Sequence, residues 1–240
     1  MSDNGYAFSH VVQTLERDKV GNIINIKFIV NETPKIYINS INISGNDRTK
    51  DSVLRRELRI SEGDPYNLTK INRSRQRLMN LGFFENVKLD TKRVSGDKID
   101  LNIQVSEKKT GELNFGIGYS TVDKINGNIG MKENNLFGTG QELGINSRIS
   151  SYSTSNEISY SKPWLFDREL KGGVSVFNNE VDSYNTISYN QKTKGATLSA
   201  TYPVLEYITH QILYSYQDNQ IGYSNSASMV ISELIGQYST

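Results

Sequence analysis

The sequence predicts an α+β module of β-α-α-β-β order, followed by long antiparallel strands of the kind that build a transmembrane β-barrel. Three contrasts across Lys109 carry this prediction. The first 109 residues hold 19 Lys and Arg against 14 Asp and Glu, a net charge of +5, and the rest holds 8 against 12, a net charge of −4. Glycine rises from 6 to 13 and tyrosine from 3 to 11, and the hydrophobic period becomes two. Such a composition favours long strands, whereas the first part is typical of a soluble α+β domain.

The module begins with a strand and a short helix. Residues 35–45 contain the alternating run IYINSINI, which predicts the strand. A helix is expected from about Thr49 to Arg59, with Thr49 as its N-cap and with Leu54 and Leu58 one turn apart on its apolar side.

A longer helix and a hairpin complete the module. The helix is expected from about Asn67 to Leu81 and is ended by Gly82. Residues 85–94 and 98–109 alternate around Ser-Gly-Asp, which predicts a β-hairpin. The residues expected inside the module are Ile43, Leu54, Leu58, Leu78 and Leu101.

Residues 1–34 repeat the last third of this module at an offset of 75 or 76 residues. Phe8-Ser9-His10-Val11 parallels Phe84-Glu85-Asn86-Val87, and a second run that starts at Gly21 parallels the run from Gly96. The repeat implies a tandem array of modules. Without the helices of its own module, this segment is expected to leave apolar side chains exposed.

From Gly111 on, apolar and polar residues alternate in about nine runs. The last three of these runs are Ile187–Gln191, Ala196–Tyr202 and Ala227–Ile231, apart from one that starts at Ile208. In an outer-membrane barrel the apolar face meets lipid, and in a soluble sandwich it meets a second sheet. The pattern favours the barrel and leaves the sandwich open. No window approaches ~18 uninterrupted apolar residues, so no transmembrane helix is predicted.

No catalytic site, cofactor or metal site is predicted. The chain has no cysteine and two histidines, His10 and His210, so thiolate and imidazole chemistry has little to draw on. The Gly-x-Gly pairs of the second part lack the Gly-Lys-Ser/Thr ending and the helix that a nucleotide loop needs. Arg73, Arg75 and Arg77 favour a solvated helix face over a nucleic-acid partner.

Five segments give the sequence a family resemblance. They are DSVLRREL at 51–58, LGFFENV at 81–87, TGELNFGIGY at 110–119, ENNLFGTGQ at 133–141 and PWLFD at 163–167. In this order they resemble the BamA family of outer-membrane assembly factors, in which periplasmic POTRA modules lead into a sixteen-stranded barrel. The resemblance implies that residues 1–34 end one POTRA module, that 35–109 form the complete last module, and that 110–240 form the first eight or nine barrel strands.

The resemblance also implies that the chain is a fragment. The 131 residues after Lys109 are too few for sixteen strands, and the chain stops before the loop motif that enters the barrel late in the sequences of this family. We therefore expect an incomplete barrel.

The function implied by the resemblance is not enzymatic. Members of this family fold β-barrel proteins and insert them into the bacterial outer membrane, which we expect to happen here by strand templating. The expected partners are unfolded β-barrel clients, accessory lipoproteins and the lipid bilayer, with the POTRA portion in the periplasm and with no nucleic acid or cofactor. The alternatives are a polypeptide exporter of the two-partner secretion type, a passive porin, and a soluble binding protein.

The strand that opens the barrel is the predicted lateral gate, where a client strand pairs. Its residues are Leu113, Asn114, Phe115, Gly116, Ile117, Gly118 and Tyr119. We expect the two glycines to leave the polar face bare and the local sheet weak. The alternative is that they only relieve crowding inside a barrel.

Two further sites are predicted in the module. An edge strand that an extended peptide can join is expected at Asn86, Val87, Lys88 and Leu89, unless its lysines guard the edge. The resemblance implies a lipoprotein-docking surface at Glu62 with Arg55 and Arg56, for which the alternative is an ordinary solvated loop acid.

Overall fold

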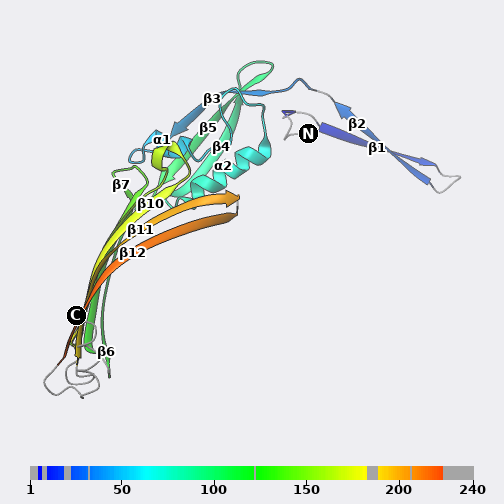
Figure 1. The fold of residues 1–240 in the computed structure, drawn as a ribbon. Coiled ribbons are helices and arrows are strands. Elements are labelled where there is room, and N and C mark those ends of the chain that lie inside the picture. The colour runs from blue at the N-terminus through cyan, green and yellow to red at the C-terminus, as the bar shows by residue number, and fades with distance from the viewer. Residues whose placement is uncertain are drawn as a thin grey trace. The chain divides into compact units, whose positions relative to one another are not determined.

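The computed structural model describes residues 5–6, 10–18, 23–31, 33–121, 123–182, 189–205 and 207–223. The chain divides into two compact units, Met1–Lys109 and Thr110–Thr240, which Figure 1 colours along the sequence. Within the described residues, no helix is both long and apolar enough to cross a membrane.

The first unit starts with a hairpin of two exposed strands. Strand β1 (His10–Asp18) pairs antiparallel with β2 (Ile23–Asn31) along its whole length. Apolar side chains are exposed on both strands, with Phe28 at 64%. The expectation that this segment leaves apolar surface uncovered is therefore confirmed.

The module after this hairpin contains a three-stranded sheet in the order β3-β5-β4. Strand β3 (Tyr37–Ser44) runs parallel to β5 (Lys98–Glu107), and β4 (Phe84–Arg93) runs antiparallel to β5 in the predicted hairpin. Since β5 lies between the other two strands, β3 and β4 are the two edges of the sheet.

The first helix is shorter than predicted and lacks the predicted cap. Helix α1 spans Asp51–Arg55, and its N-cap position is Lys50, which makes no side-chain capping bond. Thr49 is only 2% exposed, and its main-chain N–H donates to Glu107 Oε1 at 2.7 Å. A carboxylate from β5 thus binds the start of the helix in place of the predicted threonine cap. After Arg55 the chain continues in turns with tighter i to i+3 bonds, such as Glu57 N–H to Leu54 O at 3.0 Å.

The second helix agrees with its prediction. Helix α2 spans Leu68–Asn80, and the side chain of its N-cap, Asn67, accepts from the Lys70 N–H at 2.8 Å. Gly82 follows the C-cap with a φ of +74°, the left-handed conformation that ends many helices.

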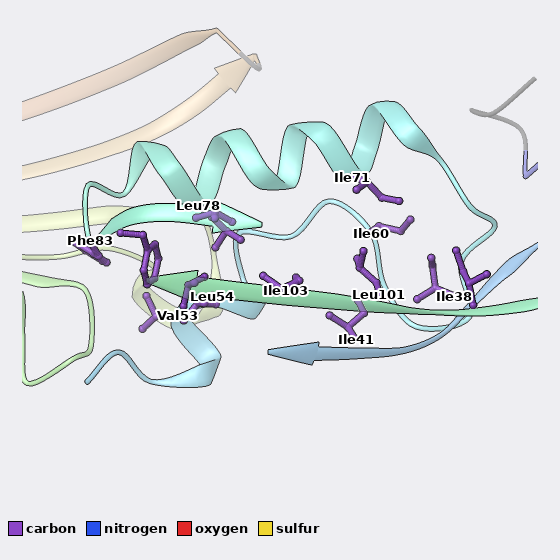
Figure 2. Close-up of a cluster of buried hydrophobic side chains, with 14 of the residues drawn as sticks. Ile38, Ile41, Val53, Leu54, Ile60, Ile71, Leu78, Phe83, Leu101 and Ile103 are labelled. Atoms are coloured by element: carbon purple, nitrogen blue, oxygen red, sulfur yellow. The ribbon is translucent and has the colours of Figure 1, made fainter. Parts of the chain in front are cut away.

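The core of the module lies between the helices and the sheet. Figure 2 shows Leu78 of α2 and Leu101 and Ile103 of β5 directed into this space. Of the predicted core residues, Leu54, Leu78 and Leu101 are fully buried, whereas Ile43 and Leu58 are partly buried and pack against the core.

The second unit is one seven-stranded antiparallel sheet, in which consecutive strands are neighbours. Figure 1 shows these strands side by side in a single curved sheet. The strands are β6 (Gly111–Ser120), β7 (Lys124–Leu136), β8 (Gln141–Ser150), β9 (Ser153–Lys162), β10 (Lys171–Asp182), β11 (Tyr189–Leu205) and β12 (Ile208–Tyr223).

Two of the predicted strands are one strand. The runs Ile187–Gln191 and Ala196–Tyr202 were expected to be separate, but β11 continues without interruption from Tyr189 to Leu205. Its partner β12 is equally long, so main-chain pairing carries the strand across the polar residues between the two runs. The predicted run Ala227–Ile231 lies outside the described residues.

One face of this sheet carries exposed apolar side chains. On β6, Leu113, Phe115, Ile117 and Tyr119 are 70% to 88% exposed. In a soluble sandwich a second sheet would cover such a face, and the described residues of this unit form only one sheet.

Candidate functional site

The predicted gate strand lies at one end of the seven-stranded sheet. Strand β6 contains all seven predicted residues, and its neighbour is β7, from Gly111 opposite Glu133 to Ser120 opposite Lys124. In the part of the chain that the structure describes, the other edge of β6 has no partner strand. Its main-chain groups on that edge are available to another strand.

The polar face of the β6–β7 pair is built from asparagine opposite glycine. Three consecutive pairs follow this rule: Asn114 with Gly130, Gly116 with Asn128, and Gly118 with Asn126. A Cβ atom added at these glycines would lie 2.6 to 3.0 Å from the facing asparagine Oδ1. The expectation of a bare face at Gly116 and Gly118 is therefore wrong, because carboxamides from the opposite strand fill the space.

The polar face of the whole sheet forms a concavity of about 840 Å³. Polar side chains from several strands line it, including those of Asn128, Ser159 and Ser199. Lys171 Nζ donates to Glu142 Oε1 at 2.8 Å and links β10 to β8 across β9. The concavity is thus hydrated in character, the opposite of the exposed apolar face.

Two motifs of the resemblance form tight turns between strands. In ENNLFGTGQ the Asn135 Oδ1 atom accepts from the Gly140 N–H at 2.8 Å, and Phe137, Gly138 and Gly140 all have positive φ. In PWLFD the residues Trp164, Phe166 and Asp167 also have positive φ. Since bulky residues rarely adopt this conformation, both motifs hold strained backbone.

Glu62 and Arg55 come together on the outer edge of β3. Glu62 Oε1 accepts from the Ile41 N–H at 3.0 Å, and Arg55 Nη2 donates to the Ile41 carbonyl at 3.0 Å. The two side chains lie 3.6 Å apart from Arg55 Nη1 to Glu62 Oε1, and Arg55 Nε also donates to Asp51 at 2.5 Å. This Glu62–Arg55 clamp occupies both main-chain groups of Ile41, as a neighbouring strand would.

The predicted third member of this surface, Arg56, is directed elsewhere. Its side chain is 20% exposed and lies 3.9 Å from Glu57, a buried carboxylate that also accepts from Arg77 Nη2 at 2.6 Å. Burial lowers the pKa of the Arg56 guanidinium, while the charge of Glu57 opposes that change. The structure therefore brings Glu62 and Arg55 together but places Arg56 with the Glu57–Arg77 pair.

The predicted peptide-binding edge is the open edge of β4. A groove of about 660 Å³ runs between this strand and α2. Its lining comprises Tyr66, Leu68, Ile71, Asn72, Arg75 and residues 86–91. Lys88 is paired with Asp90 at 2.9 Å, so this guarding lysine is partly neutralised.

The three arginines of α2 have three different partners. Arg73 Nη1 donates to Gln76, Arg77 contacts Glu57, and Arg75 Nε donates to the Val87 carbonyl on β4 at 2.8 Å. The expectation of a simple solvated face overlooked Arg75. Only its i+4 position relative to Ile71, on a helix that packs on β4, hinted at such a contact.

Metal and acid chemistry is not supported by the described residues. In residues 5–6, 10–18, 23–31, 33–121, 123–182, 189–205 and 207–223, no group of three His, Cys, Asp or Glu side chains could hold a metal ion. Candidate function therefore lies in strand edges and in exposed surfaces.

Comparison with known proteins assigns both units to families. The POTRA model, described as a surface antigen variable number repeat, matches residues 36–108, and the Omp85 superfamily domain matches residues 135–232. The outer membrane protein assembly factor BamA of Neorickettsia risticii (strain Illinois) is 33% identical over 221 residues, which are 92% of this chain and 30% of the relative. BamA of Neisseria meningitidis serogroup B is 33% identical over 216 residues, 86% of this chain and 27% of the relative. The chain thus spans about 30% of the length of these curated relatives.

Solved structures agree with this assignment. The crystal structure of BamA from Haemophilus ducreyi lacking POTRA domains 1–3 matches with a TM-score of 0.82 at 27% identity, covering 100% of this chain and 46% of that one. CdiB from Acinetobacter baumannii matches with a TM-score of 0.57 at 17% identity, covering 95% of this chain and 45% of that one, which is a likeness of fold alone. The predicted fold class, a POTRA module followed by part of an antiparallel β-barrel, is confirmed. The chain therefore belongs with the POTRA-containing proteins of the Omp85 superfamily, and it is similar over nearly its whole length to a part of BamA.

Proposed function

We propose that this chain is part of an outer-membrane assembly factor, which folds β-barrel proteins and inserts them into the membrane without enzymatic chemistry. One observation carries the proposal. The seven-stranded sheet ends in β6, which presents an edge without a partner strand among the described residues, and its apolar side chains, such as Ile117 at 88%, are exposed. The names of the curated relatives support the same function.

The physical basis is the hydrogen bonding of backbone in lipid. An unpaired N–H or C=O group costs several kcal/mol in hydrocarbon, where no water can satisfy it. A client strand that pairs with β6 has one edge satisfied as it enters, while Leu113, Phe115 and Ile117 keep contact with lipid. No nucleotide or cofactor is required for this exchange.

The proposed setting is the bacterial outer membrane. Strands of 10 to 17 residues are long enough to cross a bilayer at a tilt, and the POTRA domain would lie in the periplasm. The proposed partners are unfolded β-barrel clients, the bilayer and periplasmic lipoproteins.

We place the lipoprotein-docking surface at the Glu62–Arg55 clamp. Both side chains are about half exposed, at 52% and 45%, and they carry opposite charges in a defined geometry. Because Arg56 is directed toward Glu57, the proposed surface no longer includes it. A partner that binds here would contact charged groups already fixed to the edge of β3.

The β4 edge at residues 86–89 is the proposed holding site for extended client segments. Its support is the position of β4 at the edge of the sheet and the groove that separates it from α2. Main-chain pairing would hold a segment there without regard to most of its side chains.

Crosslinking tests the function of β6. Single cysteines at successive positions from Asn114 to Ser120 are placed in the intact protein, together with a client stalled during assembly and carrying a cysteine in its last strand. The expected result is disulfides at alternate positions that shift in register with the client cysteine. Cysteines at Ser155 to Ser161 of β9, which has a neighbour on each side, are the matched control and should not react.

Two outcomes would contradict the proposal. Crosslinks from β6 only to a strand of the same protein would make this edge a plain seam of the wall. Client crosslinks at Ser159 and Ser199 on the concave face would favour the alternative of a polypeptide exporter.

A further inference from the structure

The main-chain groups of β4 that reach its open edge can be identified from the register. The Val94 N–H donates to the Lys98 carbonyl at 3.0 Å, so Val94 directs its main-chain groups toward β5. Direction alternates along a strand, and therefore Val87, Leu89 and Thr91 direct theirs to the open edge. Of the predicted residues 86–89, only Val87 and Leu89 can pair with an added strand.

The opposite edge of the sheet is closed at each outward position up to Ile41. Ile36 is bonded to Gly5 O and Tyr66 N–H, and Ile38 is bonded to Asp64 O and Gly63 N–H, at 2.8 to 2.9 Å. The Glu62–Arg55 clamp occupies Ile41. An extended segment that seeks an edge of this module is thereby directed to β4.

Only one outward group of β4 has a side-chain partner that the structure records. Arg75 Nε donates to the Val87 carbonyl at 2.8 Å, which is where the N–H of an added strand would bind. An incoming strand must displace this guanidinium. Since Lys88 and Asp90 neutralise each other, the displaced Arg75 is the groove charge that has no acid beside it among the described residues.

We propose that Arg75 makes the β4 edge selective for extended segments that carry a carboxylate on the side facing α2. This inference rests on the proposed role of β4 as a holding site and adds its specificity. A segment with Asp or Glu at that position restores a charge-assisted hydrogen bond to Arg75 after displacing it from Val87. A segment with a neutral residue loses the bond, and one with a lysine adds repulsion.

The groove also sets the neighbouring side chain of such a segment. Leu68 lies seven residues before Arg75 on α2, about 10 Å along the helix axis. Leu68 is 41% exposed beside the groove, and side chains on one face of a strand repeat about every 7 Å. The selected segment therefore carries an apolar residue two or four positions from its carboxylate.

Peptide binding to the intact chain in detergent micelles tests the inference. The probes are three fluorescein-labelled nine-residue peptides of alternating Val and Thr, which differ only in a central Glu, Gln or Lys on the Val face. By fluorescence anisotropy the Glu peptide should bind about fivefold tighter than the Gln peptide, and the Lys peptide should bind weakest. Arg75→Glu should reverse the order in favour of the Lys peptide.

Two variants locate and control the effect. Arg73→Ala removes a charge from the same helix without touching β4, and it should leave the order unchanged. Thr91→Pro removes an outward N–H at a position where an edge strand tolerates proline, and it should weaken all three peptides. Thermal unfolding by circular dichroism checks that each variant is folded.

The outcomes separate the two proposals. Binding that Thr91→Pro weakens but that shows no order of charge, or the same order in Arg75→Glu, overturns the role of Arg75 and leaves β4 as a holding site. Failure of all three peptides to bind, or binding that Thr91→Pro does not weaken, overturns both. Neither result bears on templating at β6, which the crosslinking tests separately.

Discussion

Gly116 on β6 lies directly opposite Asn128 on β7, and the Asn128 Oδ1 atom occupies the space that a side chain at position 116 would need. The glycines of the gate strand are therefore matched to side chains of its neighbour. Pairing between β6 and β7 is built for close contact on the polar face, while the other edge of β6 is left for a new strand. This asymmetry suits a strand that must hold one neighbour and accept another.

The first prediction concerns this match. Gly116→Ala would place a Cβ 2.6 Å from Asn128 Oδ1, and we expect it to lower the free energy of unfolding by about 1 kcal/mol. Gly127→Ala is the control, since its Cβ would meet only the Gly116 carbonyl at 3.7 Å. Urea unfolding in micelles, followed by Trp164 fluorescence, measures both. Adding Asn128→Gly should reduce the loss caused by Gly116→Ala, and equal losses with and without it would contradict the proposed contact.

A second prediction separates backbone strain from crowding in the POTRA module. Gly45 has a φ of +85°, and an added Cβ would lie 2.0 Å from the main-chain oxygen of Val105 on β5. Gly45→Ala should therefore destabilise the module by roughly 2 to 5 kcal/mol. Gly82→Ala, with a φ of +74° and open space around it, should cost only about 1 kcal/mol. Similar melting temperatures for the two variants would show that the contact with Val105 is absent.

The third prediction distinguishes docking from folding at Glu62. Glu62→Gln keeps an oxygen that accepts from the Ile41 N–H but removes the charge, so stability should hardly change. Glu62→Lys loses the acceptor as well and should cost about 1 kcal/mol. If the charge binds the lipoprotein, the Gln variant should recover less lipoprotein in co-purification at an unchanged melting temperature. Full recovery with Gln and loss only with Lys would assign the effect to folding.

The fourth prediction is a dependence of stability on pH through Glu107. Burial raises the pKa of this carboxyl, but hydrogen bonds from the Thr49 side chain and from the N–H groups of Arg48 and Thr49 outweigh it, and the pKa falls below the ordinary value. A carboxyl with a lowered pKa in the folded state stabilises the fold above its unfolded pKa, and this contribution is lost as pH falls through the lowered value.

Unfolding of wild type and Glu107→Gln at several pH values measures this contribution. At pH 7 the variant should be less stable by about 1 kcal/mol, discounted for the exposure of the group. The two curves should converge at acid pH, where wild-type Glu107 is protonated. A constant difference at all pH values would show that the charge of Glu107 is irrelevant.

Much of the module could be predicted because its signals are local. The Asn67 cap, the apolar spacing of α2 and Gly82 all act within a few residues of one another, and the structure agrees with them. The first helix was predicted less well because its start is bound by Glu107, a residue 58 positions from Thr49. A pattern within the helix sequence contains no trace of that contact.

The edges were predicted in part for the same reason. Alternation identified β4 and β6 as strands, but it could not identify which main-chain groups point outward or that Arg75 covers one of them. It also could not separate Glu62 with Arg55 from Arg56, because neighbouring arginines differ only in the direction that folding gives their side chains.

The sequence by itself determined the order of the elements, the family of both units and the face of each strand that is apolar, since these follow from periods of two and 3.6 along the chain. Only the tertiary structure decided how the sheet edges are used. Ile41 is closed by the Glu62–Arg55 clamp, Val87 is covered by Arg75, and Gly116 is filled by Asn128. Each of these is a contact between residues at least twelve positions apart, and its geometry exists only after the strands and helices have packed.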